Sequence, residues 1–258
     1  MSLRGEDSDG KVYDKPDTLW QELASAPQGT QHVWYSKAVS YWDSQEASVN
    51  GVLGGFGHVS DDDIMESRKF LFKALGKGGQ GALGKCVADC GAGVGRVSQH
   101  LLLHHFQEVD LVEPSHHYIE AARKNLCELS TSHAWPSQHK AVNFYEVGLE
   151  AWAPESQRYD VIWIQWALLY LTDDDAISFF HRCKTGLKPG GIVVVKENIC
   201  KHTEFVVDKE DSSLTRSNKY MLQLFAKSNM TVLYNVLQRN FPKELFPVRM
   251  YAIKPRTS

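Results

Sequence analysis

Hydrophobic and polar residues follow two different periods along most of the chain. From residue 85 onward, short apolar runs typical of buried strands alternate with segments whose apolar residues recur at helical spacing. The expected strands are 85–89, 109–113, 142–147, 159–163, 191–196, 231–238 and 247–254, and the expected helices are 97–106, 116–129, 173–186 and 217–228. This alternation predicts an α/β fold with a doubly wound, mainly parallel, seven-stranded Rossmann-like sheet covered by helices on both faces. The last two strands are joined only by a loop, so we expect them to pair antiparallel at the sheet edge.

The first eighty residues show a different pattern. Residues 1–30 are polar and rich in turn formers, and we expect them to form a flexible tail with a short helix near residues 18–25. Residues 32–47 carry aromatic residues at helical spacing, which fits either an amphipathic helix packed on the core or a lid over a pocket. A glycine-rich loop at 49–60 leads into a helix that we expect Ser60 to cap. Residues 31–258 should therefore form a single domain, divided into a helical cover (31–80) and a Rossmann-like core (81–258).

The segment from Val87 to Arg96, VADCGAGVGR, is the starting point for the chemistry. An apolar strand that ends in alternating glycines, Gly91 and Gly93 among them, and leads into a helix is typical of an α/β nucleotide site, because glycine lets the backbone approach a ligand closely. Arg96 stands where a dinucleotide fingerprint has its third glycine, and Glu113 ends the next strand. An arginine and a strand-end carboxylate suit a ligand with an amino-acid carboxylate and a ribose but no phosphates. We therefore expect S-adenosylmethionine as the cofactor.

In an open α/β sheet the ligand lies beyond the carboxyl ends of the strands, so the residues that follow each strand are candidate contacts. Leu149 and Glu150 are equally consistent with a contact to adenine and with an exposed loop. Trp166 is either core filler or a site residue, and the amide of Asn198 is costly to bury at a strand end without a hydrogen-bond partner. The candidates after Arg96 are Glu113, Pro114, Ser115, Leu149, Glu150, Gln165, Trp166, Tyr170 and Asn198.

Composition and charge narrow the function classes. The 258 residues carry a net charge of −3, which argues against a general nucleic-acid binder, and no apolar run reaches membrane-spanning length. Five scattered cysteines indicate reduced thiols and a cytoplasmic or nuclear location, and Cys86 with Cys90 lacks the partners of a zinc site. The acidic segment 208–213, DKEDSS, is either a solvated loop or, if it faces the pocket, an attraction for a cationic substrate.

With these residues in place, the chain resembles the protein α-N-terminal methyltransferases, a class I S-adenosylmethionine-dependent family that modifies the α-amine of Xaa-Pro-Lys N termini. The resemblance runs from about residue 34 to 254 and rests on six segments. They are YSKAxxYW (35–42), LGGFGH (53–58), DCGAGVGR (89–96), YDVIWIQW (159–166), the asparagine of KEN (196–198) and DSS (211–213).

The resemblance implies a Rossmann-like methyltransferase fold, protein or peptide substrates with free N termini, and roles for individual residues. The cofactor would be held by Gly91, Arg96, Glu113, Leu149, Glu150 and Gln165, beside Gly93, Pro114 and Ser115. The peptide channel would be lined by Trp42, Trp166, Asn198, Asp208, Asp211 and Ser213. In this arrangement Asn198 fixes the first peptide unit, Trp166 packs on the proline and the acidic segment pairs with the lysine.

The resemblance also implies that Asp211 holds and helps to deprotonate the α-amine. Three positions depart from the family pattern: Glu150 stands where a glutamine is usual, Glu197 where an aspartate is, and Tyr170 where a histidine would assist proton removal. Proton removal therefore rests on Asp211, with Tyr170 or water as the helper. Two rivals remain, a small-molecule amine methyltransferase and a catalytically silent cofactor-binding regulator, whereas Arg96 in place of the third glycine disfavours a nicotinamide dehydrogenase.

Overall fold

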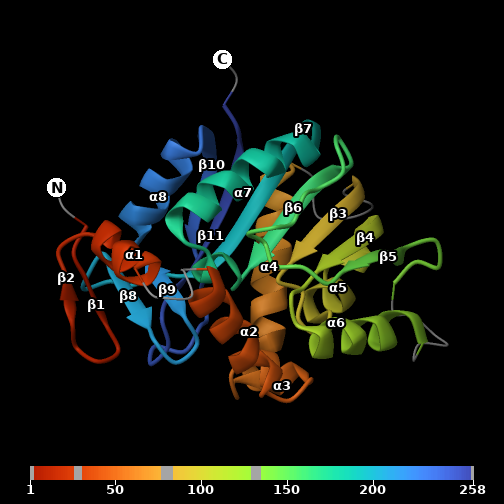
Figure 1. Cartoon of the computed structure of the whole chain (residues 1–258). Coiled ribbons are helices and arrows are strands. Elements are labelled where there is room, and N and C mark those ends of the chain that lie inside the picture. The colour runs from red at the N-terminus through yellow and green to blue at the C-terminus, as the bar shows by residue number, and fades with distance from the viewer. Residues whose placement is uncertain (1–2, 26–30, 77–83, 129–134, 257–258) are drawn as a thin grey trace.

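The structure is a computed structural model that describes residues 3–25, 31–76, 84–128 and 135–256, and its centre is a seven-stranded sheet (Figure 1). The strand order is β10-β11-β7-β6-β3-β4-β5. The bounds are β3 (Gly84–Cys90), β4 (Phe106–Val112), β5 (Lys140–Tyr145), β6 (Tyr159–Gln165), β7 (Leu187–Asn198), β10 (Met230–Leu237) and β11 (Val248–Pro255). The five strands from β7 to β5 are parallel, and β11 is antiparallel to both β7 and β10. The predicted fold class and the antiparallel edge are confirmed.

Alternate residues of the central strands point to opposite faces of the sheet and pack into two hydrophobic cores. Ile162 and Ile164 of β6 pack on one face beneath α7 (Asp173–Gly186) and α8 (Asn218–Lys227). Val161 and Trp163 pack on the other face with α4 (Ser60–Ala74), α5 (Arg96–His100) and α6 (His116–Arg123). Because both faces are covered, the central part of each inner strand is apolar on both sides, which is why it appears in the sequence as a short continuous apolar run. None of the described helices is both long and apolar enough to cross a membrane.

Two helices differ from their predicted bounds. The helix expected at 97–106 ends at His100, because the chain turns through the short 3-10 segment η3 (Leu102–His104) and enters β4 at Phe106. The three leucines 101–103 are fully buried there, so their apolar character reflects burial of a turn. The helix expected at 116–129 passes from α6 into the π-turn η4 (Lys124–Glu128), and residue 129 lies outside the described residues. Ser60 is the first residue of α4 and not its cap.

The prediction of a flexible N-terminal tail is wrong for residues 3–25. They form β1 (Gly5–Asp7), β2 (Val12–Tyr13) and α1 (Pro16–Ala24), and residues 1–2 and 26–30 lie outside the described ranges. β1 pairs in parallel with β8 (Phe205–Asp208), which pairs antiparallel with β9 (Ser213–Arg216), so a second sheet has the order β2-β1-β8-β9. Figure 1 shows this N-terminal arm beside the β8–β9 hairpin.

The arm has its own small apolar core, which explains why a polar segment is ordered. Its buried members come from the arm, from the segment before α2, from the hairpin and from α8: Tyr13, Leu19, Trp34, Phe205, Val207, Leu214 and Tyr220. The apolar residues of the arm are too few for a periodic signal, and its partner strand lies far downstream. The strands β8 and β9 were not predicted either, and the reason is the same.

The predicted helical cover (31–80) divides into two parts: α4 packs on one face of the sheet, and four short segments lie across the carboxyl ends of the parallel strands. They are η1 (Gln31–Tyr35), α2 (Ser36–Asp43), α3 (Val49–Val52) and η2 (Gly57–Val59). The indole of Trp34 donates to the Tyr170 carbonyl at 2.6 Å, and the Tyr35 hydroxyl donates to Asp175 at 2.5 Å. These bonds anchor the aromatic helix to the core, while its inner face lines a cavity, so α2 both packs on the core and covers a pocket. The expected boundary between cover and core falls in residues 77–83, outside the described ranges.

Candidate active site

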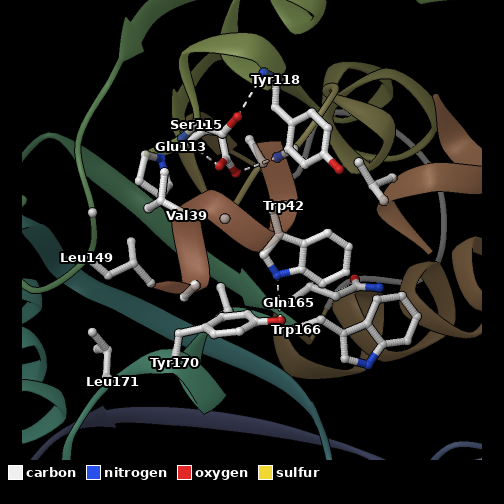
Figure 2. A pocket seen from close by; sticks show the side chains of 18 of the residues that line it. Val39, Trp42, Glu113, Ser115, Tyr118, Leu149, Gln165, Trp166, Tyr170 and Leu171 are labelled. Carbon is white, nitrogen blue, oxygen red and sulfur yellow. Dashed lines mark hydrogen bonds between the residues drawn. The ribbon is translucent and has the colours of Figure 1, made fainter. Parts of the chain in front are cut away.

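A cavity at the carboxyl ends of β3, β4 and β6 collects the residues predicted to bind the cofactor (Figure 2). Its wall includes Gly91, Gly93, Arg96, Glu113, Pro114, Ser115, Leu149, Glu150 and Gln165. α2 closes the cavity from the outside with Val39 and Trp42, and Tyr118 of α6 lies beside Ser115. The structure therefore brings the whole predicted set to one place, although the role of each residue stays a prediction.

The glycine turn leaves no room for larger side chains. Gly91 has a φ of +75°, and a Cβ built on it would lie 2.3 Å from the Cβ of Ala167. Gly93 has a φ of +54°, and its backbone N–H donates to a carboxylate oxygen of Glu113 at 2.9 Å. Both the left-handed backbone and the close approach require glycine here. The turn thus presents bare backbone to the cavity in front of the N-terminus of α5.

Glu113 is a buried carboxyl group held in a fixed orientation. Its two oxygens accept from the backbone N–H groups of Gly93 and Ser115, at 2.9 and 3.0 Å. Burial raises the pKa of Glu113 to about 7, against the opposing effect of these two hydrogen bonds. Each carboxylate oxygen has a second lone pair, so Glu113 can accept two further hydroxyl donors from a ligand. A ribose supplies that pair of donors.

The neighbouring side chains connect the cover to the core. The Ser115 hydroxyl caps α6 by accepting from the Tyr118 N–H at 3.2 Å, and it donates to Asp43 at the end of α2 at 2.5 Å. On the opposite wall Leu149 is buried, and burial raises the pKa of Glu150. The apolar side chain of Leu149 can pack on a purine ring, and the carboxyl group of Glu150 can accept from the amino group of that ring.

Arg96 belongs to a buried ion cluster that the sequence did not reveal. Its Nη1 lies 2.9 Å from Oδ2 of Asp63, which is fully buried and also pairs with the ammonium of Lys196. Gln165 donates to Asp63 at 2.8 Å and accepts from the Trp163 indole at 3.1 Å. Burial lowers the pKa of Lys196 to about 8, against the attraction of Asp63. Asp63 is one of three acids in the first turn of α4, and it holds Arg96 and Gln165 against the cavity.

Among the described residues, Asp63 is the one carboxylate that forms ion pairs with both Arg96 and Lys196. The guanidinium of Arg96 lines the cavity and carries five N–H donors, of which Nη1 also donates to Ser60 at 3.3 Å. A carboxylate on a ligand can accept from the guanidinium N–H groups that face the cavity. The glycine cradle, the Glu113 acceptor and this cationic wall together fit S-adenosylmethionine, which has a ribose, an amino-acid carboxylate and no phosphates.

A second cleft shares a wall with the cavity. Trp42, Trp166 and Tyr170 line both spaces. Trp166 follows β6 with a φ of +51°, a conformation that is strained for a bulky residue and that recurs at functional sites. Its ring lies 5.7 Å from the Arg96 guanidinium carbon and 6.0 Å from the Lys196 ammonium. The strained backbone thus holds an aromatic wall between the two spaces.

The second cleft brings together the residues predicted to bind the peptide. Besides the two tryptophans it is lined by Asn198, Asp208, Asp211 and Ser213. The segment 208–213 is the turn of the β8–β9 hairpin, and two of its acids, Asp208 and Asp211, line the cleft. This position agrees with an attraction for a cationic substrate, which stays a prediction.

Asp211 and Tyr170 form a hydrogen-bonded chain that ends at the cover. The Trp42 indole donates to the Tyr170 hydroxyl at 2.8 Å, and that hydroxyl donates to Oδ2 of Asp211 at 3.1 Å. The other oxygen, Oδ1, is buried and has no hydrogen-bond partner in the part of the chain that the structure describes. Burial and the nearby Asp208 raise the pKa of Asp211. Burial also raises the pKa of Tyr170 well above its ordinary value, so its hydroxyl stays protonated.

Asn198 is oriented by its neighbours. The Trp166 indole donates to Oδ1 of Asn198 at 3.1 Å, and because an indole N–H can only donate, the amide NH₂ faces the other way. Glu197 lies fully buried behind it and accepts from the backbone N–H of Asn198 at 2.9 Å and of Leu169 at 3.2 Å. Burial raises the pKa of Glu197 to about 8. The NH₂ of Asn198 remains as a donor for a carbonyl oxygen in the cleft.

The residues on the apolar side of the cleft, and the one at its edge on the arm, were not predicted as site residues. These residues are Leu53, Phe56, Val59, Phe241, Leu245, Phe246 and Ser8. Phe56 and Phe246 are 40% and 43% exposed, which is unusual for large apolar side chains. Leu53, Phe56 and Val59 belong to the glycine-rich segment 49–60, whereas Ser8 and the residues from Phe241 to Phe246 carry no local signal.

Comparison with known proteins identifies the family. Residues 30–254 match the family model of the AdoMet dependent proline di-methyltransferases. The chain is 45% identical to an alpha N-terminal protein methyltransferase 1 of Arabidopsis thaliana, over 98% of this chain and 91% of the relative. It is 40% identical to an N-terminal Xaa-Pro-Lys N-methyltransferase 1 of Danio rerio, over 87% of this chain and 96% of the relative.

A solved structure agrees with these relatives. A SAM-dependent methyltransferase of Leishmania major superposes with a TM-score of 0.87 and 37% identity, covering 98% of this chain and 97% of that one. The parallel sheet, the glycine turn with its strand-end carboxylate and the match over residues 30–254 lead to one conclusion. The chain belongs to the AdoMet-dependent proline dimethyltransferase family and is an S-adenosylmethionine-dependent methyltransferase.

Proposed function

We propose that this protein transfers methyl groups from S-adenosylmethionine to the α-amine of proteins whose N termini begin with Xaa-Pro-Lys. The observation that carries the proposal is the buried, unpartnered Oδ1 of Asp211, in a cleft that adjoins the cofactor cavity across the wall of Trp42, Trp166 and Tyr170. The names of the relatives from Arabidopsis and Danio rerio support the same substrate class.

Asp211 acts on the proton of the α-amine. S-adenosylmethionine supplies a methyl group on a sulfonium sulfur, and the amine must be neutral and aligned to accept it. An α-amine has a pKa of about 8, against about 10.4 for a lysine side chain, so its deprotonation is easier by roughly 3 kcal/mol. Burial raises the pKa of Asp211, which makes it a better acceptor for that proton. A carboxylate therefore suffices as the base for an α-amine.

Tyr170 positions this carboxylate. Its hydroxyl receives the Trp42 indole N–H and therefore directs its own proton toward Asp211. With its pKa raised by burial, Tyr170 does not take a proton at neutral pH. Where the family usually has a histidine, this chain has a donor that fixes the base.

The remaining cleft residues align the peptide. The amide NH₂ of Asn198 donates to the carbonyl of the first residue, and the ring of Trp166 packs on the proline. Asp208, which is exposed at the cleft, pairs with the lysine at the third position, while Ser213 completes the wall beside Asp211. The aromatic rings of Trp42 and Trp166 also tolerate the cationic character of a methylated amine, which is compatible with successive methylation.

The two rivals fit the site less well. A small-molecule methyltransferase needs a closed pocket, whereas this cleft runs from Trp166 to the exposed rings of Phe56 and Phe246 at its edge. A silent regulator has no need for a buried carboxylate oxygen aimed into the cleft, as Asp211 has. An extended peptide with its amine at Asp211 uses both features.

The direct test is incubation with S-adenosylmethionine and a peptide that begins Ser-Pro-Lys, followed by mass spectrometry. Mass gains of one to three methyl groups on the free peptide, and none on an N-acetylated copy, are expected. A copy with the proline replaced by alanine should react poorly. If the protein binds the cofactor but no peptide gains mass, the proposal fails.

We also propose that the protein acts in the cytoplasm or nucleus and not on nucleic acid. The buried cysteines 86, 90, 183 and 200 are free thiols, which suits a reducing compartment. Imaging of a fluorescent fusion tests the location, and retention on immobilised DNA or RNA at physiological salt would contradict the second part.

A further inference from the structure

The N-terminal arm binds a lysine that is next in sequence to Asp208, a residue of the substrate cleft. Lys209 lies in the turn of the β8–β9 hairpin, between the acids Asp208 and Asp211. Its ammonium does not pair with either of them. It lies 2.8 Å from a carboxylate oxygen of Asp7 and 2.9 Å from one of Asp9, both on the arm. The arm thus binds the one cation of this turn.

The acids of the turn are left without a cation. Within the described ranges no ion pair involves Asp208, Glu210 or Asp211. Oδ1 of Asp208 accepts only from the nearby backbone N–H of Glu210, at 2.8 Å, and Oδ1 of Asp211 has no protein partner in the same ranges. The negative charge of the turn is therefore available to a cation that enters the cleft.

The arm stays in place by contacts that do not need the lysine side chain. β1 pairs with β8 from Gly5 to Asp7, and the Ser8 N–H donates to the Val207 carbonyl at 2.8 Å. Asp7 also accepts from the Tyr13 hydroxyl at 3.0 Å and from two backbone N–H groups of its own hairpin. The ion pairs to Lys209 are thus an addition to an anchored arm, and their loss should release the ammonium more than it displaces the backbone.

We propose that Asp7 and Asp9 sequester Lys209 and thereby keep the acids of the cleft free for the lysine of the substrate. This inference rests on the proposed function and names a specificity determinant for it. A released lysine, on its flexible four-carbon stem, would pair with Asp208 or Asp211 at a high effective concentration and compete with the substrate cation. Asp7 and Asp9 lie outside residues 30–254, which match the family model, so the determinant belongs to the arm.

The test compares two peptides that differ at the third residue. Ser-Pro-Lys and Ser-Pro-Gln peptides are titrated by calorimetry into the full-length protein saturated with S-adenosylhomocysteine. In the Asp7→Asn/Asp9→Asn variant, the dissociation constant of the lysine peptide should rise about three- to fivefold, as expected for losing an exposed charge pair, while that of the glutamine peptide changes less than about twofold. Adding Lys209→Met should restore the affinity for the lysine peptide.

Matched controls separate sequestration from simple disorder. Tyr13→Phe removes another donor to Asp7 without releasing Lys209, so both affinities should remain as in the wild type. If the double variant melts early, Asp9→Asn alone, at a side chain 70% exposed, should give a smaller effect of the same selectivity. Equal weakening for both peptides, or no recovery with Lys209→Met, would overturn the inference. A wild-type protein that binds neither peptide refutes the proposed function itself.

Discussion

The cofactor cavity and the substrate cleft share the wall of Trp42, Trp166 and Tyr170 but are assembled from different parts of the chain. The cavity is built mainly from consecutive strand-to-helix turns of one parallel sheet, so most of its contacts follow a strand that the sequence already indicates, and α2 adds Val39 and Trp42. The cleft is built from α2, the hairpin β8–β9, the segment near residue 246 and the arm. A local pattern therefore predicts the first site, whereas the second depends on pairing between segments far apart in sequence.

The two regions also differ in how they hold charge. In the cavity, the buried carboxylate of Asp63 is neutralised by Arg96 and Lys196, and burial keeps Glu113 poised near neutrality with a pKa of about 7. In the cleft, Asp208 and Asp211 face an open space without a protein cation among the described residues. The cavity is organised to orient a cofactor of fixed structure, and the cleft to attract and deprotonate a cationic substrate.

The substitution with the largest expected loss of activity lies in the cleft and leaves the cavity unchanged. Asp211→Asn keeps the shape of the side chain but removes the base, so kcat should fall by about 100- to 1000-fold, the usual contribution of general base catalysis. Single-turnover mass spectrometry measures this rate. The affinity for S-adenosylhomocysteine should not change, and Asp208→Asn, the neighbouring control, should raise KM for the peptide with little loss of kcat. A kcat of Asp211→Asn within tenfold of wild type would contradict the assignment.

The next largest effect is expected on cofactor binding in the cavity. Gly91→Ala places a Cβ 2.3 Å from that of Ala167, on a backbone with a φ of +75°. Backbone strain and steric overlap of about 2–3 kcal/mol should weaken cofactor binding by about 30- to 100-fold. Gly190→Ala is the matched control, because Gly190 has a φ of +82° but no atom within 4 Å of the new Cβ. Calorimetry that finds wild-type cofactor affinity in Gly91→Ala would show that the turn does not contact the ligand.

A smaller effect concerns pH and again separates the two regions. With a pKa of about 7, Glu113 is mostly protonated at pH 6 and mostly ionised at pH 8. The ionised carboxylate accepts from both ribose hydroxyls, so cofactor affinity should rise as pH increases through 7 and level off above it, by about five- to tenfold in total. Glu113→Gln gives the baseline for the ligand's own titration and should lack this rise. Parallel curves for the two proteins would argue against a ribose contact at Glu113.

The smallest expected effect tests whether Tyr170 positions the carboxylate of Asp211. Tyr170→Phe removes one hydrogen bond to Asp211, so kcat should fall by about fivefold, as for the loss of one hydrogen bond of about 1 kcal/mol. That hydrogen bond lowers the pKa of Asp211, so without it the pKa rises. Activity should then begin to fall at a higher pH as the solution is acidified. A pH profile that does not move would show that Tyr170 has no influence on the base.

The sequence predicts the sheet and the cavity well because their signals are local. Gly91 to Arg96 and Glu113 follow apolar strands that are buried on both faces, and β11 and β10 are joined only by a loop. Asp63 and Lys196 were not predicted as cavity residues, because a buried ion pair between a helix and a distant strand leaves no periodic pattern.

The arm was predicted as a flexible tail for a related reason. Its ordering depends on backbone pairing with β8 and on a small shared core with Phe205 and Leu214, and neither partner is visible near residues 3–25. The resemblance to a known family reached the cleft residues from residue 34 onward, and it gave no information on Asp7 or Asp9. Long-range pairing therefore accounts for most of what the sequence did not predict.

The proposed function requires that the two spaces hold a cofactor and a peptide N terminus that meet at their shared wall. A crystal structure of the protein with S-adenosylhomocysteine and a Ser-Pro-Lys peptide tests it most directly. The expected structure has the α-amine within hydrogen-bond distance of Oδ1 of Asp211, the proline on the ring of Trp166 and the ribose hydroxyls on Glu113. A peptide bound with its amine away from Asp211, or entering from another face of the molecule, would contradict it.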